Sequence, residues 1–258
     1  MKKESPLPKN VFYDINKLPK EFGILVFPIS IIRADHGKGQ GAEQIMEYVK
    51  IFSPDKVSEP KIGLNIIYGD FLYFNSPEPA ISLKNKFMGM VLGHKNQFQK
   101  LLTREWNRFQ IQHAFSYEVW NQLYLNYRGD FKSDYERFRQ ASLKDQKFLK
   151  YLEEDAEYCG RELTDEQVSF FLEEHFMLYL LSKKQIVLPN EYVQDRERWV
   201  LWCYPGKVLK GQVYVYQKNP LELEAPENPY ENCTYDLEAK KLIDFTRIDL
   251  DTYNYKYE

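Results

Sequence analysis

The chain has 258 residues, of which 43% are hydrophobic and 16% aromatic, a composition too rich in apolar side chains for a disordered protein. Its length allows one large domain or two small ones. With 35 Lys and Arg against 38 Asp and Glu, the net charge is −3 at pH 7, which excludes a uniformly basic, histone-like protein.

The first half of the chain has the pattern of a βαβ unit. Residues 1–22 are polar and contain prolines, so we expect an N-terminal arm. The run GILVFPISII (23–32) is almost wholly apolar and rich in β-branched residues, which predicts a buried strand. Apolar residues at helical spacing in AEQIMEYVKIF predict a helix, and IGLNIIYGDFLYF (62–74) predicts a second strand. Strands joined by such a helix usually pair in parallel.

The second half continues with helices and strands. A helix is predicted over 82–109, a third strand at HAFSYEV and helical sequence over 133–159. Thr164, with Gln167 three residues later, predicts the N-cap of a helix that continues to about Leu181. WVLWCY (199–204) predicts another buried strand, and the alternating GQVYVYQ (211–217) predicts one more.

Three segments are therefore expected: the arm at 1–22, an α/β domain at 23–220 and a C-terminal extension at 221–258. The extension has ten acidic and four basic residues, and we expect it to pack on the domain or to trail from it.

A glycine-rich loop follows the first predicted strand. Gly37, Gly39 and Gly41 alternate in HGKGQG, and glycines allow backbone N–H groups to approach a phosphate at the start of a helix. The loop lacks both the Gly-Lys-Ser/Thr of a Walker A motif and the full GxGxxG pattern, and Asp70 lies within the strand-like run instead of ending it. Nucleotide or S-adenosylmethionine binding remains an alternative function, and a simple flexible connection is the other interpretation.

The predicted helix over 82–109 is strongly basic. Residues 84–108 carry six basic side chains and one acidic one, Glu105. Lys100, Arg104 and Arg108 follow at intervals of four and share a helix face, and we expect Lys95 within reach of it. Such a face is often merely solvated, but in an acidic chain it also indicates contact with a nucleic-acid backbone. A noncatalytic RNA-binding protein is therefore a further alternative.

Ser30 lies at the carboxyl end of the first predicted strand, the edge at which ligands bind in open α/β sheets. No histidine lies in a nucleophile-elbow context, so a hydrolase triad is not indicated. A serine can still act as nucleophile when its substrate arrives already activated. The alternative is a strand-end hydroxyl that caps a backbone group.

Two carboxylates interrupt the apolar helix expected after Thr164. Glu173 and Glu174 lie in its middle, and Phe170 shares a face with Glu174. A carboxylate there is paired, displaced to the rim or functional. We interpret His175 as a structural or surface residue.

Together these segments resemble the tRNA-dependent cyclodipeptide synthases. GILVFPIS is similar to the first strand of that family, which ends in its nucleophilic serine, and LNIIYGD to its second strand. HKNQFQKLLTREWNRF resembles its basic tRNA-binding helix, VSFFLEEHF its Tyr-x-x-x-Glu helix, and WVLWCYPGK the strand with a pocket tyrosine. The resemblance spans roughly residues 23–210, and it depends on the order and spacing of motifs that are individually weak.

The resemblance implies a Rossmann-like parallel sheet flanked by helices, similar to the catalytic domains of class I aminoacyl-tRNA synthetases. It implies Ser30 as nucleophile, Glu174 as the group that holds the substrate amine, and Tyr204 and Phe170 in the catalytic pocket. Phe170 stands where the motif has tyrosine, Pro28 stands where it has glycine, and Arg33 occupies the place of an asparagine. Arg33 and Glu173 are further pocket candidates.

The implied partner is aminoacyl-tRNA, bound by Lys95, Lys100, Arg104 and Arg108, and the implied product is a cyclic dipeptide, as in natural product biosynthesis. No cofactor or metal is expected, because the amino acids arrive activated and the three cysteines lack paired spacing. No apolar run reaches the ~18 residues that span a bilayer, and no apolar signal segment begins the chain. We expect a cytoplasmic monomer or weak dimer.

Overall fold

The structure is a computed structural model. It describes residues 12–13, 23–30, 41–52, 62–69, 81–109, 115–119, 126–186, 199–203, 207–224, 232–236 and 241–255.

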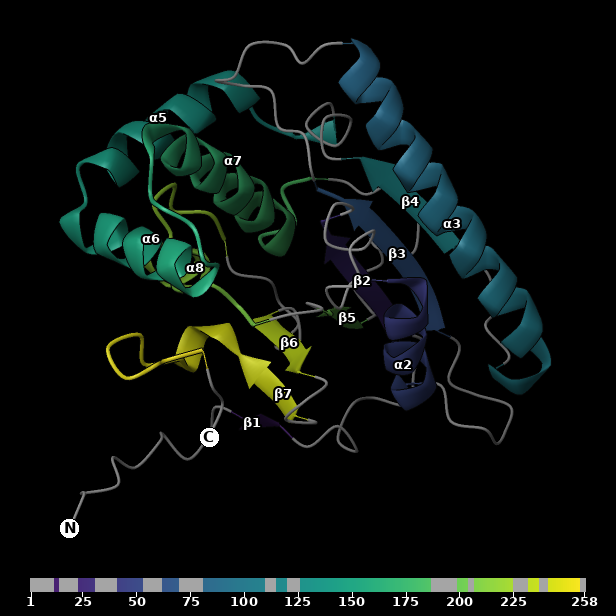
Figure 1. Cartoon of the computed structure of the whole chain (residues 1–258). Helices are drawn as coiled ribbons and strands as arrows, with labels where there is room; N and C mark the ends of the chain where they lie inside the picture. Colours follow the sequence, from purple (N-terminus) through teal and green to yellow (C-terminus); the bar gives the residue numbers. More distant parts are fainter. Residues whose placement is uncertain are drawn as a thin grey trace.

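The described strands form one seven-stranded sheet in the order β1-β7-β6-β5-β2-β3-β4 (Figure 1). Their bounds are β1 Phe12–Tyr13, β2 Gly23–Ile29, β3 Ile62–Tyr68, β4 Phe115–Val119, β5 Trp199–Trp202, β6 Cys233–Asp236 and β7 Lys241–Asp244. Five neighbouring strands, from β6 to β4, are parallel, whereas β7 and β1 run antiparallel at one edge.

The order of the parallel strands defines the fold class. The chain builds outward from β2 through β3 to β4, and then returns to the other side of β2 with β5 and β6. This is the strand order of a Rossmann-like sheet, with the reversal between β2 and β5. The predicted α/β fold, a parallel sheet flanked by helices, is therefore confirmed.

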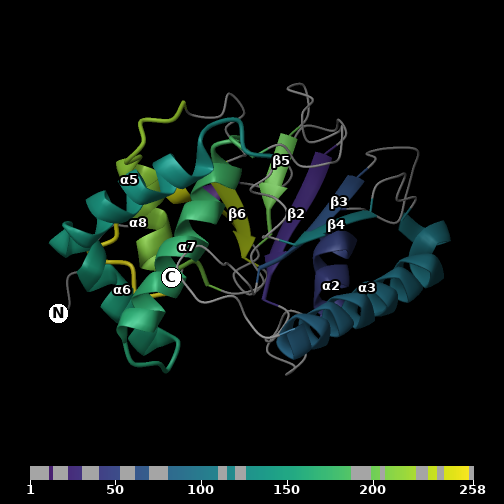
Figure 2. The ribbon, with the colours of Figure 1, turned by 90° about the horizontal axis from the view of Figure 1, so that it is seen from above.

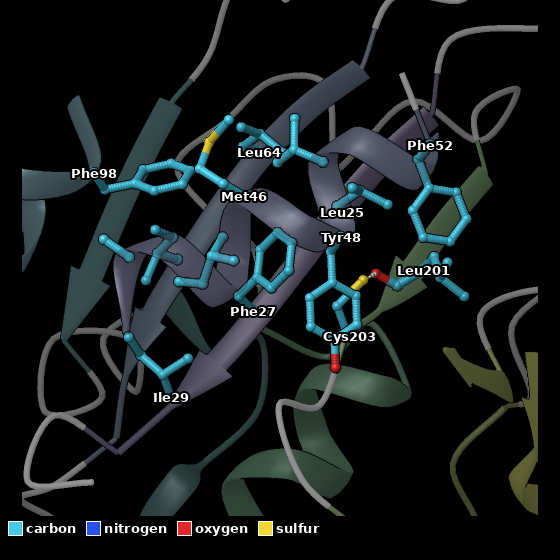
Figure 3. Close-up of a cluster of buried hydrophobic side chains, with 14 of the residues drawn as sticks. Leu25, Phe27, Ile29, Met46, Tyr48, Phe52, Leu64, Phe98, Leu201 and Cys203 are labelled. Atoms are coloured by element: carbon cyan, nitrogen blue, oxygen red, sulfur yellow. Dashed lines mark hydrogen bonds between the residues drawn. The ribbon is translucent and has the colours of Figure 1, made fainter. Parts of the chain in front are cut away.

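One face of the sheet packs against α2 (Ala42–Phe52) and α3 (Ile81–Phe109). Alternate residues of β2, namely Leu25, Phe27 and Ile29, enter this core (Figure 3). Met46 and Tyr48 come from α2 and Phe98 from α3. Because side chains of a strand alternate between faces, this set fixes which residues of β2 point the other way.

The opposite face lies under a layer of four helices (Figure 2). They are α5 Phe131–Leu143, α6 Gln146–Tyr158, α7 Asp165–Ser182 and α8 Lys210–Lys218. Val26, Ile67 and Trp202 of the sheet share a buried cluster with apolar residues of α7. The sheet is therefore covered on both faces, as its near-continuous apolar strands require.

Side-chain caps set the helix boundaries. Thr164 accepts a hydrogen bond from the backbone N–H of Gln167 at 3.3 Å and begins α7, as predicted. The single helical stretch predicted over 133–159 is divided into α5 and α6, because Asp145 accepts from the N–H groups of Lys147 and Phe148 and starts a new helix. An aspartate that caps its own chain favours a helix start over a helix interior.

The strand predicted at 211–217 is wrong: these residues belong to α8. The carboxylate of Asp155, on α6, accepts hydrogen bonds from the backbone N–H groups of Lys210 and Gly211, both at 2.8 Å. This cap comes from a distant segment, so the local sequence does not reveal it. Val213, Val215 and Tyr216 are all buried, and the burial of α8 on more than one side hides its helical periodicity.

The two ends of the chain join the sheet. β1 from the expected arm pairs with β7, and β6 and β7 come from the expected acidic extension. Strands from the expected arm and from the expected extension thus belong to the same sheet as the strands of the expected domain, and the division into three segments stays a prediction. Beyond β7, a 3-10 turn at Phe245–Arg247 leads to a segment in which the hydroxyl of Tyr253 donates to the carbonyl of Val208 at 2.8 Å.

Candidate active site

Ser30 follows β2 at the carboxyl edge of the sheet and is half-buried. On one side of β2, the N–H of Gly69 donates to the carbonyl of Ile29 at 2.9 Å; on the other, the N–H of Cys203 donates to the carbonyl of Val26 at 2.8 Å. β3 therefore ends beside the last residue of β2, whereas β5 ends opposite Val26, three residues earlier. This is the point of strand-order reversal, where α/β proteins form their ligand crevice.

The alternation of β2 indicates the side on which Ser30 lies. Leu25, Phe27 and Ile29 point to the core under α2 and α3, while Val26 belongs to the cluster that contains α7 residues. Ser30 has the same parity as Val26. β2 ends at Ile29, and continuation of its alternation through Ser30 would direct the hydroxyl towards the α7 side of the sheet.

Helix α7 carries the predicted carboxylates and Phe170. Glu173 is 3% exposed, whereas Glu174 is half-buried. Phe170 is also half-buried, packs against the apolar cluster of the helical layer and meets Phe171 edge to face at 6.0 Å. Phe170 thus packs in the cluster that includes Val26, Ile67 and Trp202 of the sheet.

His175 is a structural residue, as interpreted from the sequence. Its ring is 1% exposed and stacks on Phe171 at 5.7 Å between centroids. Within the described part of the chain, neither of its ring nitrogens has a hydrogen-bond partner. Burial lowers the pKa of His175 to about 3, so the imidazole is neutral at physiological pH.

Helix α3 lies on the opposite side of the sheet. Because it connects the parallel strands β3 and β4, it begins at the carboxyl edge and runs back towards the amino edge. Its outward face is open, and Asn96, Gln99, Lys100 and Thr103 line a shallow hollow there. No acidic residue occurs between Ile81 and Arg104.

The four predicted tRNA-binding residues do not share one face of α3. Lys100 and Arg104 are exposed, while Lys95 is half-buried. At about 100° per residue, Lys95 lies roughly 140° around the helix from Lys100. Arg108 belongs to α3, but its side chain is outside the described set. Lys86, exposed and five turns before Arg104, lies on the same flank as Arg104, and the sequence pattern alone did not single it out.

Several candidates lie outside the described residues. They are Arg33, Tyr204, Asp70 and the loop glycines before Gly41. Gly41 itself precedes α2, and its carbonyl accepts hydrogen bonds from the N–H groups of Gln44 and Ile45. The nucleotide alternative therefore stays a prediction, as do the pocket roles of Arg33 and Tyr204.

The sequence did not predict two polar contacts at this edge, one buried and one partly buried. The hydroxyl of Tyr68, the last residue of β3, and Nδ1 of His94 on α3 share a hydrogen bond of 2.9 Å. Lys207 pairs with Asp236 at the end of β6, with Nζ and Oδ2 2.7 Å apart. The sequence contains one signal for the Tyr68–His94 contact. His94 lies in the apolar stripe of its helix, three residues after Val91 and four before Phe98.

Among the residues that the structure describes, no group of three His, Cys, Asp or Glu side chains is arranged to hold a metal ion. Within the same residues, no helix has both the length and the apolar character needed to cross a bilayer.

No family model matches this chain, and no curated protein does. A solved structure of a CDPS (cyclodipeptide synthase) from Fluoribacter dumoffii is similar over 79% of this chain and 87% of that chain, with 13% sequence identity and a TM-score of 0.43. This is a distant structural resemblance, and it does not by itself define a function.

Proposed function

We propose that the protein is an aminoacyl-tRNA-dependent transferase that forms a cyclic dipeptide through an aminoacyl-serine intermediate. The observation that carries the proposal is the position of Ser30 directly after β2, at the strand-order reversal. The basic outward face of α3 and the order of motifs along the sequence support it.

In the first step, the Ser30 hydroxyl attacks the ester carbonyl of an aminoacyl-tRNA. The bond between the acyl carbon and the ribose oxygen breaks, an ester to Ser30 forms, and the serine proton passes to the leaving ribose oxygen. Because the ester is already activated, this exchange of one ester for another needs no ATP and no strong base.

In the second step, the amine of another aminoacyl-tRNA attacks the acyl-serine, which forms an amide and releases Ser30. The free amine of the resulting dipeptidyl-tRNA then attacks its own ester, closes the ring and releases the second tRNA. Two ester bonds are consumed and two amide bonds are formed, so the reaction balances without a cofactor.

Glu174 is assigned to the substrate amine. A carboxylate binds the α-ammonium group of the first amino acid and accepts its proton when the amine must become a nucleophile. Glu174 is half-buried on α7. Glu173, Phe170, Arg33 and Tyr204 are assigned to the surrounding pocket, and Phe170 lacks the hydroxyl that the resembled motif supplies there.

The tRNA is assigned to the outward face of α3. Lys86, Lys100 and Arg104 form an exposed row that spans 18 residues, or about 27 Å of helix. Contacts of this kind bind phosphates and position the substrate without reading its sequence.

The test is transfer of label from radiolabelled aminoacyl-tRNAs to the protein. Wild type should retain acid-stable label on Ser30, and Ser30→Ala should retain none. Ser133→Ala, at an exposed position on α5, is the matched control and should label like wild type. Absence of label on wild type across the common amino acids would refute the proposal. Mass spectrometry of cells that express wild type or Ser30→Ala should show new cyclic dipeptides only with wild type.

A further inference from the structure

A buried hydrogen bond attaches α3 to the carboxyl edge of the sheet. Tyr68 is fully buried and His94 is 7% exposed. The hydroxyl of Tyr68 and Nδ1 of His94 lie 2.9 Å apart, and the two rings meet edge to face at 5.6 Å. The contact joins the last residue of β3 to the middle of the helix.

The hydrogen bond between Tyr68 and His94 depends on direction, whereas the apolar contacts of α3 around it do not. His94 lies in the inward stripe of α3 between Val91 and Phe98, both fully buried and apolar. Apolar contacts tolerate a small rotation or slide of a helix, whereas a hydrogen bond weakens steeply once its distance or angle changes. The Tyr68–His94 hydrogen bond therefore opposes rotation and sliding of α3 more specifically than the apolar packing around it does.

The same bond is close to Ser30 through the backbone. Tyr68 pairs in register with Ile29, and the next N–H along the chain, that of Gly69, donates to the Ile29 carbonyl. Ser30 follows Ile29 directly. A single backbone hydrogen bond, from Gly69 to Ile29, thus joins the residue before Ser30 to the residue after Tyr68.

The position of α3 matters because the two functional surfaces lie on opposite sides of the sheet. Lys100 and Arg104 are on α3, over one face, and the alternation of β2, continued through Ser30, would direct its hydroxyl to the other. An acyl group carried by a tRNA on α3 must therefore reach over the carboxyl edge. Tyr68 ends its strand at this edge. Its hydrogen bond to His94 therefore influences the distance that the acyl group must cross from α3 to Ser30.

We infer that Tyr68 and His94 are positioning residues, which set the place of the outward face of α3 relative to Ser30. This inference rests on the proposed function. The pair controls the rate at which a docked aminoacyl-tRNA transfers its acyl group, and it leaves the affinity for tRNA largely unchanged.

The experiment compares Tyr68→Phe with Tyr127→Phe. Tyr68→Phe keeps the ring and removes only the hydroxyl bonded to His94. Tyr127→Phe removes a hydroxyl that donates to Asp134 at 2.7 Å in the helical layer, and it is the matched control. At saturating aminoacyl-tRNA, Tyr68→Phe should lower the rate of Ser30 acylation about five- to tenfold, the effect of one hydrogen bond. The Kd for tRNA should change less than about twofold, and Tyr127→Phe should alter neither quantity.

A second variant, His94→Phe, tests the pair from the other side. If the two groups act as a unit, His94→Phe and the double variant should each reduce the rate by about the same factor as Tyr68→Phe. Multiplicative reductions in the double variant would overturn the inference, and so would an equal acylation rate in Tyr68→Phe and wild type. Absence of label on wild type would instead refute the proposed function and the inference with it.

Discussion

The carboxylate of Asp155 and the hydroxyl of Tyr255, a hundred residues apart in the chain, share a hydrogen bond of 2.7 Å. The same carboxylate caps α8 through the N–H groups of Lys210 and Gly211. It is fully buried. A single side chain of α6 thus fastens both the start of α8 and the C-terminal segment, close to where the chain leaves β5.

Asp155 should make stability depend on pH. Burial raises its pKa from the ordinary 3.8 to about 6, against the opposing hydrogen bonds from Tyr255, Gly211 and Lys210. The native state then binds a proton near pH 6, and the unfolded state binds it only near pH 3.8. This group's contribution to the free energy of unfolding therefore rises as pH falls from 7 to 4, by at most about 3 kcal/mol. Asp155→Asn should remove that rise, measured by urea unfolding at pH 7 and pH 5.

Asp145 is the matched control, since it also caps a helix. Burial acts to raise its pKa, but the hydrogen bonds from Lys218 and Tyr214 outweigh burial and hold the pKa below 3.8. Its stabilisation is therefore present above about pH 4 and disappears as pH falls further. Asp145→Asn should leave the change in stability between pH 7 and pH 5 as in wild type. If the two variants had the same profile, the assignment of the pH dependence to Asp155 would be wrong.

Gly211→Ala should destabilise the fold. A Cβ at this position would lie 2.8 Å from Nε2 of His175, 2.8 Å from Cδ2 of Leu152 and 3.1 Å from Oδ2 of Asp155. These atoms are packed in the helical layer, so the overpacking should cost about 1–3 kcal/mol. Gly89→Ala is the control: the space around its Cβ is open, and alanine in a helix interior should stabilise by about 0.5–1 kcal/mol. Chemical denaturation of both variants checks the signs, and a stable Gly211→Ala would contradict the close packing around His175.

Local patterns in the sequence were sufficient to predict most of the sheet and the long helices. The runs around Leu25, Leu64 and Leu201 became buried parallel strands, because a strand covered on both faces has an unmistakable apolar composition. The strands β6 and β7 were missed, since each has four residues within an acidic, turn-rich sequence. Helix α8 was missed because Asp155, 55 residues before Lys210, supplies its cap.

The site was predictable only where it depends on local order. The place of Ser30 at a strand end could be predicted because the end of a strand is a local feature, and its catalytic role stays a prediction. The hydrogen bond between Tyr68 and His94 joins residues 26 apart that no short pattern connects. The position of Lys95 away from Lys100 and Arg104 follows from helical geometry alone, so the sequence already contained that distinction.

Removal of the exposed basic row of α3 should weaken tRNA binding and its salt dependence. The triple variant Lys86→Ala, Lys100→Ala and Arg104→Ala should reduce the slope of log K against log salt by about 2, on the order of 0.7–0.9 for each phosphate that is no longer neutralised. Lys95→Ala alone should change the slope by less than the amount expected for one phosphate, because this half-buried residue lies on the other flank.

The control for this charge change is Lys132→Ala with Lys144→Ala, two exposed lysines of the helical layer at and beside α5. Filter binding or fluorescence anisotropy between about 50 and 300 mM salt, concentrations of the order at which such slopes are measured, gives the slopes. The control removes two positive charges and the α3 variant three, so a reduction in the control of two thirds of that in the α3 variant would mean that tRNA is attracted by overall charge and not by α3.

The two carboxylates in the middle of α7 should have different roles: we expect Glu174 to act on the substrate and Glu173 to stabilise the fold. Glu174 is half-buried and Glu173 is 3% exposed, so Glu174 is the better placed to meet a substrate amine. Glu174→Gln should slow dipeptide formation about 10²-fold or more, as expected for removal of a group that binds and deprotonates an amine, with little change in the midpoint of thermal unfolding. Glu173→Gln, an equal change of charge one residue away, should shift that midpoint more and the rate less. The rates come from single-turnover assays with labelled aminoacyl-tRNA, and the reverse ranking would reassign the amine-binding role to Glu173.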